Sequence, residues 1–151
     1  MGSNSAIPSL KNERGCRIIS QKGYYCSQMI MNLGQRMLDN PNEGAVRAMC
    51  GLNGGVGFQG DICGALTGAC CLIGYAAGKG SDEEMDSDEL GAMMEELYNW
   101  FVESHSTNQG SCNCRDLLDG NLMNKVTLCP VLVEESLNKA MGILTEHEVV
   151  E

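Results

Sequence analysis

The sequence has no excess of basic residues. Its ten lysines and arginines stand against twenty aspartates and glutamates, which leaves a net charge of −10. Nucleic-acid backbones and anionic lipid surfaces repel such a charge, so we expect neither class of partner. The charge favours solubility and would suit a partner protein with a basic surface.

Long apolar runs and targeting signals are also missing. Residues 1–10 lack the basic segment and apolar stretch that mark a secretory signal. The most apolar stretch, residues 62–77, is interrupted by three glycines and is too short to span a bilayer comfortably. We therefore expect a cytoplasmic protein that does not insert into membranes.

Several cofactor motifs are absent. The glycine-rich stretch 51–60 has no following Gly-Lys-Ser or Gly-Lys-Thr and no preceding strand, so no nucleotide loop is predicted. No C-x-x-C-H motif is present for covalent haem. The two histidines, His105 and His147, lie near predicted helix ends, and we interpret them as solvated surface residues rather than ligands. The acidic run 82–88 lacks calcium-loop spacing.

What the sequence does contain is nine cysteines in 151 residues. Without an export signal, a disulfide scaffold is not the expected explanation. In a reducing compartment, this number of cysteines indicates metal, cluster or thiol chemistry, although some will be small buried hydrophobic residues.

Apolar residues recur with the period of α-helices in several segments, and the alternation typical of strands appears nowhere. The sequence predicts an all-α, single compact domain of about five helices over residues 20–147, after a polar arm at residues 1–19. The predicted helices cover residues 26–39, 42–50, 63–78, about 90–104 and 129–144, with a short helical piece at 115–118.

A glycine-rich loop, residues 51–60, precedes the helix predicted at 63–78. Such a loop needs positive φ angles or a very close backbone approach. Within that helix, Gly64 and Gly68 are each followed by an alanine, which removes side-chain bulk at four-residue spacing. Because another backbone can then pack tightly there, we predict that this is the central, most buried helix.

Four cysteines fall at predicted helix starts: Cys26, Cys63, Cys114 and Cys129. Cys129 precedes Pro130, and because proline favours the first turn of a helix, Cys129 is predicted to be an N-cap. Free N–H groups and the helix dipole stabilise a thiolate and lower its pKa. The alternative is that all four are buried structural cysteines. This fits less well, because an apolar side chain is not easily buried at the start of a helix.

The other five cysteines carry weaker signals. Cys16 lies in or beside the polar arm, and Cys50, Cys70 and Cys71 are interpreted as core packing residues. Cys112 forms a C-x-C pair with Cys114. This pair could chelate a metal or form a strained disulfide, or Cys112 could be an ordinary loop residue.

Two segments resemble the signature of the C-GCAxxG-C-C family of redox-active proteins. They are Gly-Gly-Val-Gly at 54–57 and Cys-Gly-Ala-Leu-Thr-Gly at 63–68, although the run here is Cys-Gly-Ala where the family name has Gly-Cys-Ala. The family's other cysteine segments also occur in the expected order: Tyr-Cys-Ser-Gln at 25–28, Cys-Arg-Asp-Leu at 114–117 and Cys-Pro at 129–130. The resemblance therefore covers about residues 20–145.

The resemblance implies four signature cysteines, which fall on Cys26, Cys63, Cys114 and Cys129. A similar domain occurs in split-Soret-type cytochromes, where iron–sulfur binding by these cysteines has been suspected and the protein is dimeric. We therefore also expect a homodimer.

Three functions remain open. In the first, the four cysteines bind an iron–sulfur cluster that exchanges electrons with a redox partner protein. In the second, Cys63 is the attacking thiol of a thiol–disulfide oxidoreductase, although no C-x-x-C pair is present to supply a resolving cysteine. In the third, three or four cysteines hold zinc in a structural module, with Cys112 as a further possible ligand.

Overall fold

The computed structural model describes residues 19–150. Within them, six α-helices and two 3₁₀-helices form and no β-strand does, so the predicted all-α class is confirmed. About five helices and one short helical piece were expected; the count is higher because two further segments form the 3₁₀-helices. The elements are α3 (Cys26–Leu38), α4 (Glu43–Ala48), η1 (Met49–Leu52), α5 (Gly64–Ala77), α6 (Leu90–His105), α7 (Cys114–Leu117), η2 (Leu122–Asn124) and α8 (Lys125–Glu146).

The predicted arm at residues 1–19 lies outside the described residues except for Ile19. The side chain of Ile19 is fully buried in the core. The domain boundaries at residues 20 and 147 remain a prediction. In the part of the chain that the structure describes, no helix combines the length and apolar character needed to cross a bilayer.

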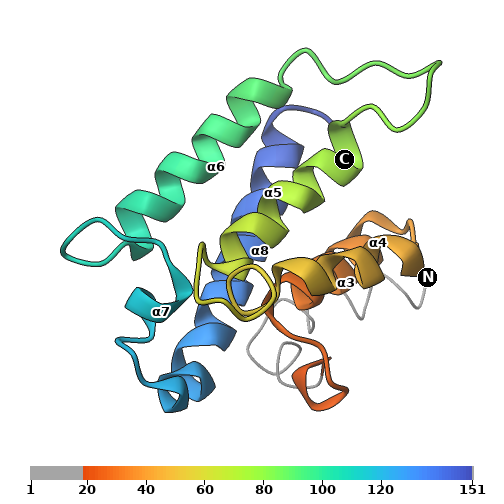
Figure 1. The fold of residues 1–151 in the computed structure, drawn as a ribbon. Helices are drawn as coiled ribbons and strands as arrows, with labels where there is room; N and C mark the ends of the chain where they lie inside the picture. The colour runs from red at the N-terminus through yellow and green to blue at the C-terminus, as the bar shows by residue number, and fades with distance from the viewer. Residues whose placement is uncertain (1–18, 151) are drawn as a thin grey trace.

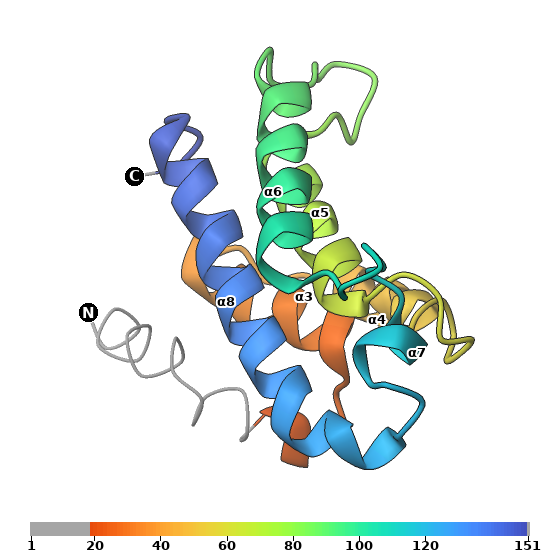
Figure 2. The same cartoon turned by 90° about the vertical axis from the view of Figure 1, so that its left-hand side faces the viewer.

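α5 is the central helix, as predicted. It packs against α3, α6 and α8, and in Figure 1 α8 crosses behind it while α6 lies to its left. Leu66, Leu72 and Ile73 of α5 are almost completely buried. α6 and α8 run in opposite directions, as Figure 2 also shows.

Glycines allow α3 and α5 to approach closely. A Cβ atom at Gly68 would lie 2.9 Å from the Cα atom and 3.2 Å from the carbonyl oxygen of Ser27. On the other helix, a Cβ atom at Gly34 would lie 2.5 Å from both methyl carbons of Leu72. As predicted, the missing side chains of Gly64 and Gly68 allow another backbone to pack closely against α5, and that backbone is the start of α3.

The glycine loop folds back on itself through two backbone hydrogen bonds. Gly60 N–H donates to the carbonyl of Gly54 over 3.1 Å, and Asp61 N–H donates to that of Gly55 over 3.0 Å. Gly55 has a φ of 77°, and a Cβ there would overlap the backbone of Asp61, so only glycine fits. Val56 and Phe58 also have positive φ angles, 62° and 65°, which are strained conformations for these side chains.

The last helix begins earlier than the sequence predicts. α8 starts at Lys125, directly after η2, and Pro130 lies inside it. Cys129 is therefore not an N-cap but part of the second turn of α8. The signal for the true start is Asn121, whose side chain accepts a hydrogen bond from Met123 N–H at the beginning of η2, 3.0 Å away.

Candidate functional site

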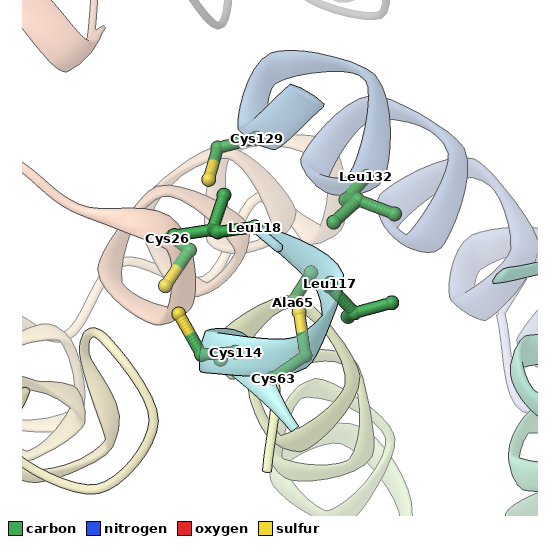
Figure 3. A pocket seen from close by; sticks show the side chains of 9 residues that line it. Cys26, Cys63, Ala65, Cys114, Leu117, Leu118, Cys129 and Leu132 are labelled. Atoms are coloured by element: carbon green, nitrogen blue, oxygen red, sulfur yellow. The ribbon is translucent and has the colours of Figure 1, made fainter. Parts of the chain in front are cut away.

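Four cysteine side chains line one hollow between α3, α5, α7 and α8, the four-cysteine hollow (Figure 3). Cys26 is the first residue of α3, Cys63 is the N-cap of α5, Cys114 is the first residue of α7 and Cys129 lies in α8. Four cysteines that lie far apart in the sequence thus line the same hollow. The remaining lining consists of Gly64, Ala65, Leu117, Leu118 and Leu132.

Backbone pairing brings Cys63 and Cys114 together from distant parts of the sequence. Cys63 N–H donates to the carbonyl of Cys112 over 2.8 Å, and Cys114 N–H donates to that of Asp61 over 2.6 Å. Between these bonds lies an isolated antiparallel bridge from Ile62 to Asn113. This short pairing docks α7 beside the start of α5.

Cys26 lies among the other three thiols. Electrostatic interactions connect it to Cys63, Cys114 and Cys129. In Figure 3, its sulfur and that of Cys114 point toward each other. A Cβ atom at Gly64 would overlap the sulfur of Cys26 and lie 3.1 Å from the carbonyl oxygen of Leu52. Gly64 therefore provides the space that this thiol occupies.

A buried polar network fixes the backbone next to Cys26. The Ser27 hydroxyl contacts Oδ1 of Asn53 at 2.6 Å and the carbonyl of Met49 at 2.9 Å. Asn53 Nδ2 donates to Oε1 of Gln28 over 2.9 Å. Sequence reasoning missed these residues because nothing in the Ser-Gln pair identifies a partner so far along the chain.

Burial dominates the acidity of three thiols in the hollow, those of Cys63, Cys114 and Cys129. It raises the pKa of Cys63 to about 12, although the N–H groups of Ala65 and Leu66 at the start of α5 act in the opposite direction. Burial also raises the pKa of Cys129 to about 12 and that of Cys114 above its ordinary value. The predicted lowering of the pKa at helix starts is wrong for these three thiols. The reason is that desolvation outweighs the backbone amides.

The ammonium group of Lys125 lies near the hollow. Lys125 lowers the pKa of Cys114 and Cys129, against the larger effect of burial. Its Nζ atom lies 4.8 Å from the ring centre of Tyr25 and 5.7 Å from that of Phe58. The two rings meet edge to face at 5.1 Å, so they hold the ammonium beside the thiols.

The other described cysteines do not line the hollow. Cys70 and Cys71 are half-buried in α5 and pack against the core, as predicted. Cys112 also packs against the core. Its carbonyl accepts the hydrogen bond from Cys63 N–H, so it lies beside the hollow, but its side chain does not line it. Cys50 is exposed and not a core residue, because η1 carries it to the surface. Cys16 lies outside the described residues.

Both histidines are paired with glutamates rather than freely solvated. Nε2 of His105 lies 3.0 Å from Glu135, and Nδ1 of His147 lies 2.7 Å from Glu89. Their side chains are 14% and 19% exposed, which corrects the expectation of solvated residues. The correction follows from the packing of α8 against α6, and neither histidine lines the hollow.

The donor set of the hollow suits a soft metal centre. Its lining contains thiols and apolar side chains but no carboxylate or imidazole, and thiolates prefer zinc, copper(I) and iron–sulfur clusters. The free space is about 20 Å³, room for roughly one water molecule. As the side chains stand, no group of three or more Cys, His, Asp or Glu residues among residues 19–150 is arranged to hold a metal ion. Binding therefore requires the thiols to turn inward and the lining to adjust.

The comparisons with known proteins agree with the resemblance seen in the sequence. Neither the curated proteins nor the solved structures contain a match to the chain. The model of the family described as "Putative redox-active protein (C_GCAxxG_C_C)" matches residues 24–143, a range that includes all four cysteines of the hollow. The chain therefore belongs to the C-GCAxxG-C-C family of redox-active proteins.

Proposed function

We propose that the four-cysteine hollow binds an iron–sulfur cluster through Cys26, Cys63, Cys114 and Cys129, and that the protein transfers electrons to or from a redox partner protein. The observation that carries this proposal is the convergence of four thiols, from four separate elements, on one apolar hollow. A single chain supplies all four ligands, so the proposal needs no second copy. The homodimer remains a prediction.

The raised thiol pKa values support a metal rather than a free-thiol role. Burial keeps these thiols protonated, because a buried thiolate lacks a positive charge to balance it. A bound metal ion would displace the protons and supply that positive charge. When bound, the cluster would accept and release single electrons. Cys26 lies close enough to the other three thiols to interact with each electrostatically, and it would hold the cluster together with them.

The surrounding residues would tune such a centre. Leu117, Leu118 and Leu132 limit the access of water, and the N–H groups of Ala65 and Leu66 point at the sulfur of Cys63. Lys125 adds a positive charge near Cys114 and Cys129. Hydrogen bonds to sulfur, nearby charge and solvent exclusion are the properties that set cluster potentials.

Thiol–disulfide exchange with Cys63 as the attacking residue has less support. The thiolate is the reactive form, yet Cys63 is only 6% exposed and its pKa is about 12. At neutral pH, nearly all Cys63 is therefore protonated and shielded from a substrate disulfide. Zinc binding as a structural module is the third candidate, and metal analysis separates it from the first.

The test is anaerobic reconstitution with iron and sulfide, followed by metal and acid-labile sulfide analysis and visible absorption. We expect a brown protein containing both elements, and a Cys26→Ser variant that contains neither above background. Cys71→Ser is the matched control, because Cys71 lies on α5 but not in the hollow, and it should load like the unmodified protein. Colourless protein lacking both elements, or unchanged loading of Cys26→Ser, would reject the proposal. Zinc without sulfide would favour the structural module.

A further inference from the structure

A second cleft lies between α3 and α4, apart from the four-cysteine hollow and sharing no residue with it. Figure 1 shows the two helices side by side. The cleft holds about 520 Å³, far more than the hollow, and lies in the size range of small-molecule sites. Most of the residues that line it are polar, and the proposed redox centre makes no use of it.

Two arginines line this cleft, and neither has an ion-pair partner among the residues that the structure describes. Arg36 comes from the last turn of α3 and Arg47 from the last turn of α4. Neither forms an ion pair with any residue between 19 and 150, although Glu43 lines the same cleft one turn before Arg47. In a chain with a net charge of −10, two unpaired guanidinium groups in one cleft indicate a site for a negative charge from outside.

The frame that carries the arginines is held in place. Gln35 is 4% exposed, and its side chain bonds the backbone of Asn42 twice, donating to the carbonyl and accepting from the N–H, each over 2.9 Å. Asn42 in turn caps α4 by accepting from Ala45 N–H over 3.1 Å. The two helices are thus clamped to each other, so the backbone that carries the two exposed arginines is fixed before a ligand arrives.

Further polar groups in the cleft are also available. The side chains of Asn32 and Tyr24 line it and make no hydrogen bond to another described residue. They can therefore bind the uncharged part of a ligand. Guanidinium groups bind carboxylates and phosphates through paired hydrogen bonds.

We propose that the cleft between α3 and α4 binds a small anion bearing carboxylate or phosphate groups, held by Arg36 and Arg47. This site is independent of the redox centre, and either proposal can fail without the other.

Cys50 makes the proposal testable, because this exposed thiol lines the cleft. The metal-free protein is treated with iodoacetamide, a neutral reagent, in the presence of pyrophosphate, citrate or sodium chloride at equal ionic strength. Mass spectrometry then gives the alkylation rate at each cysteine. We expect pyrophosphate or citrate to slow alkylation of Cys50 at least threefold relative to chloride, and to leave Cys71 unchanged.

Variants separate a specific site from general screening. The double variant Arg36→Gln, Arg47→Gln should lose the protection of Cys50, and Arg36→Lys, Arg47→Lys should keep part of it. Arg115→Gln removes a charge outside the cleft and should protect Cys50 like the unmodified protein. Equal rates in all three salts, or protection that persists in the glutamine double variant with an unchanged helical circular dichroism spectrum, would overturn the proposal.

Discussion

The position of the Cys26 sulfur depends on Gly64, the residue whose missing side chain makes room for it. We expect Gly64→Ala to displace this thiol, lower the iron bound per chain by more than half, and destabilise the protein by about 1–3 kcal/mol through overpacking. Iron analysis after reconstitution and urea unfolding measure the two effects.

Gly142→Ala is the control for that substitution. Gly142 lies within α8, and a Cβ atom there meets nothing within 4 Å. Alanine should stabilise the helix by about 0.5–1 kcal/mol and leave iron binding unchanged. Equal iron binding and equal stability of Gly64→Ala and the unmodified protein would show that Cys26 does not depend on this space.

At the residue scale, the sequence predicts which cysteines meet but not their acidity. Helix starts and motif order are local patterns, and they select Cys26, Cys63, Cys114 and Cys129. The pKa of Cys63 depends instead on what covers it, and a buried position cannot be derived from spacing. The Ser27–Asn53 contact escapes prediction for the same reason, since it joins residues that share no local pattern.

At the element scale, helical periodicity predicts the long helices well because each buries a continuous apolar face against α5. It fails at the start of α8. A Cys-Pro pair fits both the first turn of a helix and a proline inside one, and only the preceding chain decides between them. The residues before Cys129 are already helical, since η2 leads directly into α8 at Lys125.

Pro130 therefore interrupts the hydrogen bonds of α8. Lacking an N–H group, it leaves the carbonyl of Val126 without its helical donor. We expect Pro130→Ala to raise the free energy of unfolding by about 1–3 kcal/mol, measured by urea denaturation of the metal-free protein. The control is Val131→Ala at the neighbouring exposed position, which should change it by less than about 0.5 kcal/mol. No gain in stability for Pro130→Ala would contradict this assignment.

At the scale of the whole molecule, the acidic run 82–89 and the four-cysteine hollow lie at opposite ends. The loop before α6 and the end of α8 lie away from α7 and the start of α8 (Figures 1 and 2). The loop before α6 carries the acidic run 82–89 and the end of α8 carries Glu146, whereas Lys125 lies near the hollow. A basic partner surface, which the net charge suits, would therefore be drawn to the end away from the hollow.

Burying thiols also makes the stability of the metal-free protein sensitive to alkaline pH. The pKa of Cys63 is about 12 in the folded state, against an ordinary value of 9.0. Above pH 9 the unfolded chain loses this proton first, so the free energy of unfolding decreases as pH rises from 9 toward 12. For this thiol the loss at pH 10 is about 1.4 kcal/mol.

Urea unfolding of the reduced, metal-free protein at pH 8 and pH 10 measures this loss. Cys63→Ala should lose about 1.3 kcal/mol less stability between the two pH values than the unmodified protein, because the variant has no buried thiol at this position. Cys50→Ala, which removes an exposed thiol, should show the same loss as the unmodified protein. If Cys63→Ala loses as much stability as Cys50→Ala, the burial of Cys63 does not govern its ionisation. The argument that a metal must replace its proton would then lose its physical basis.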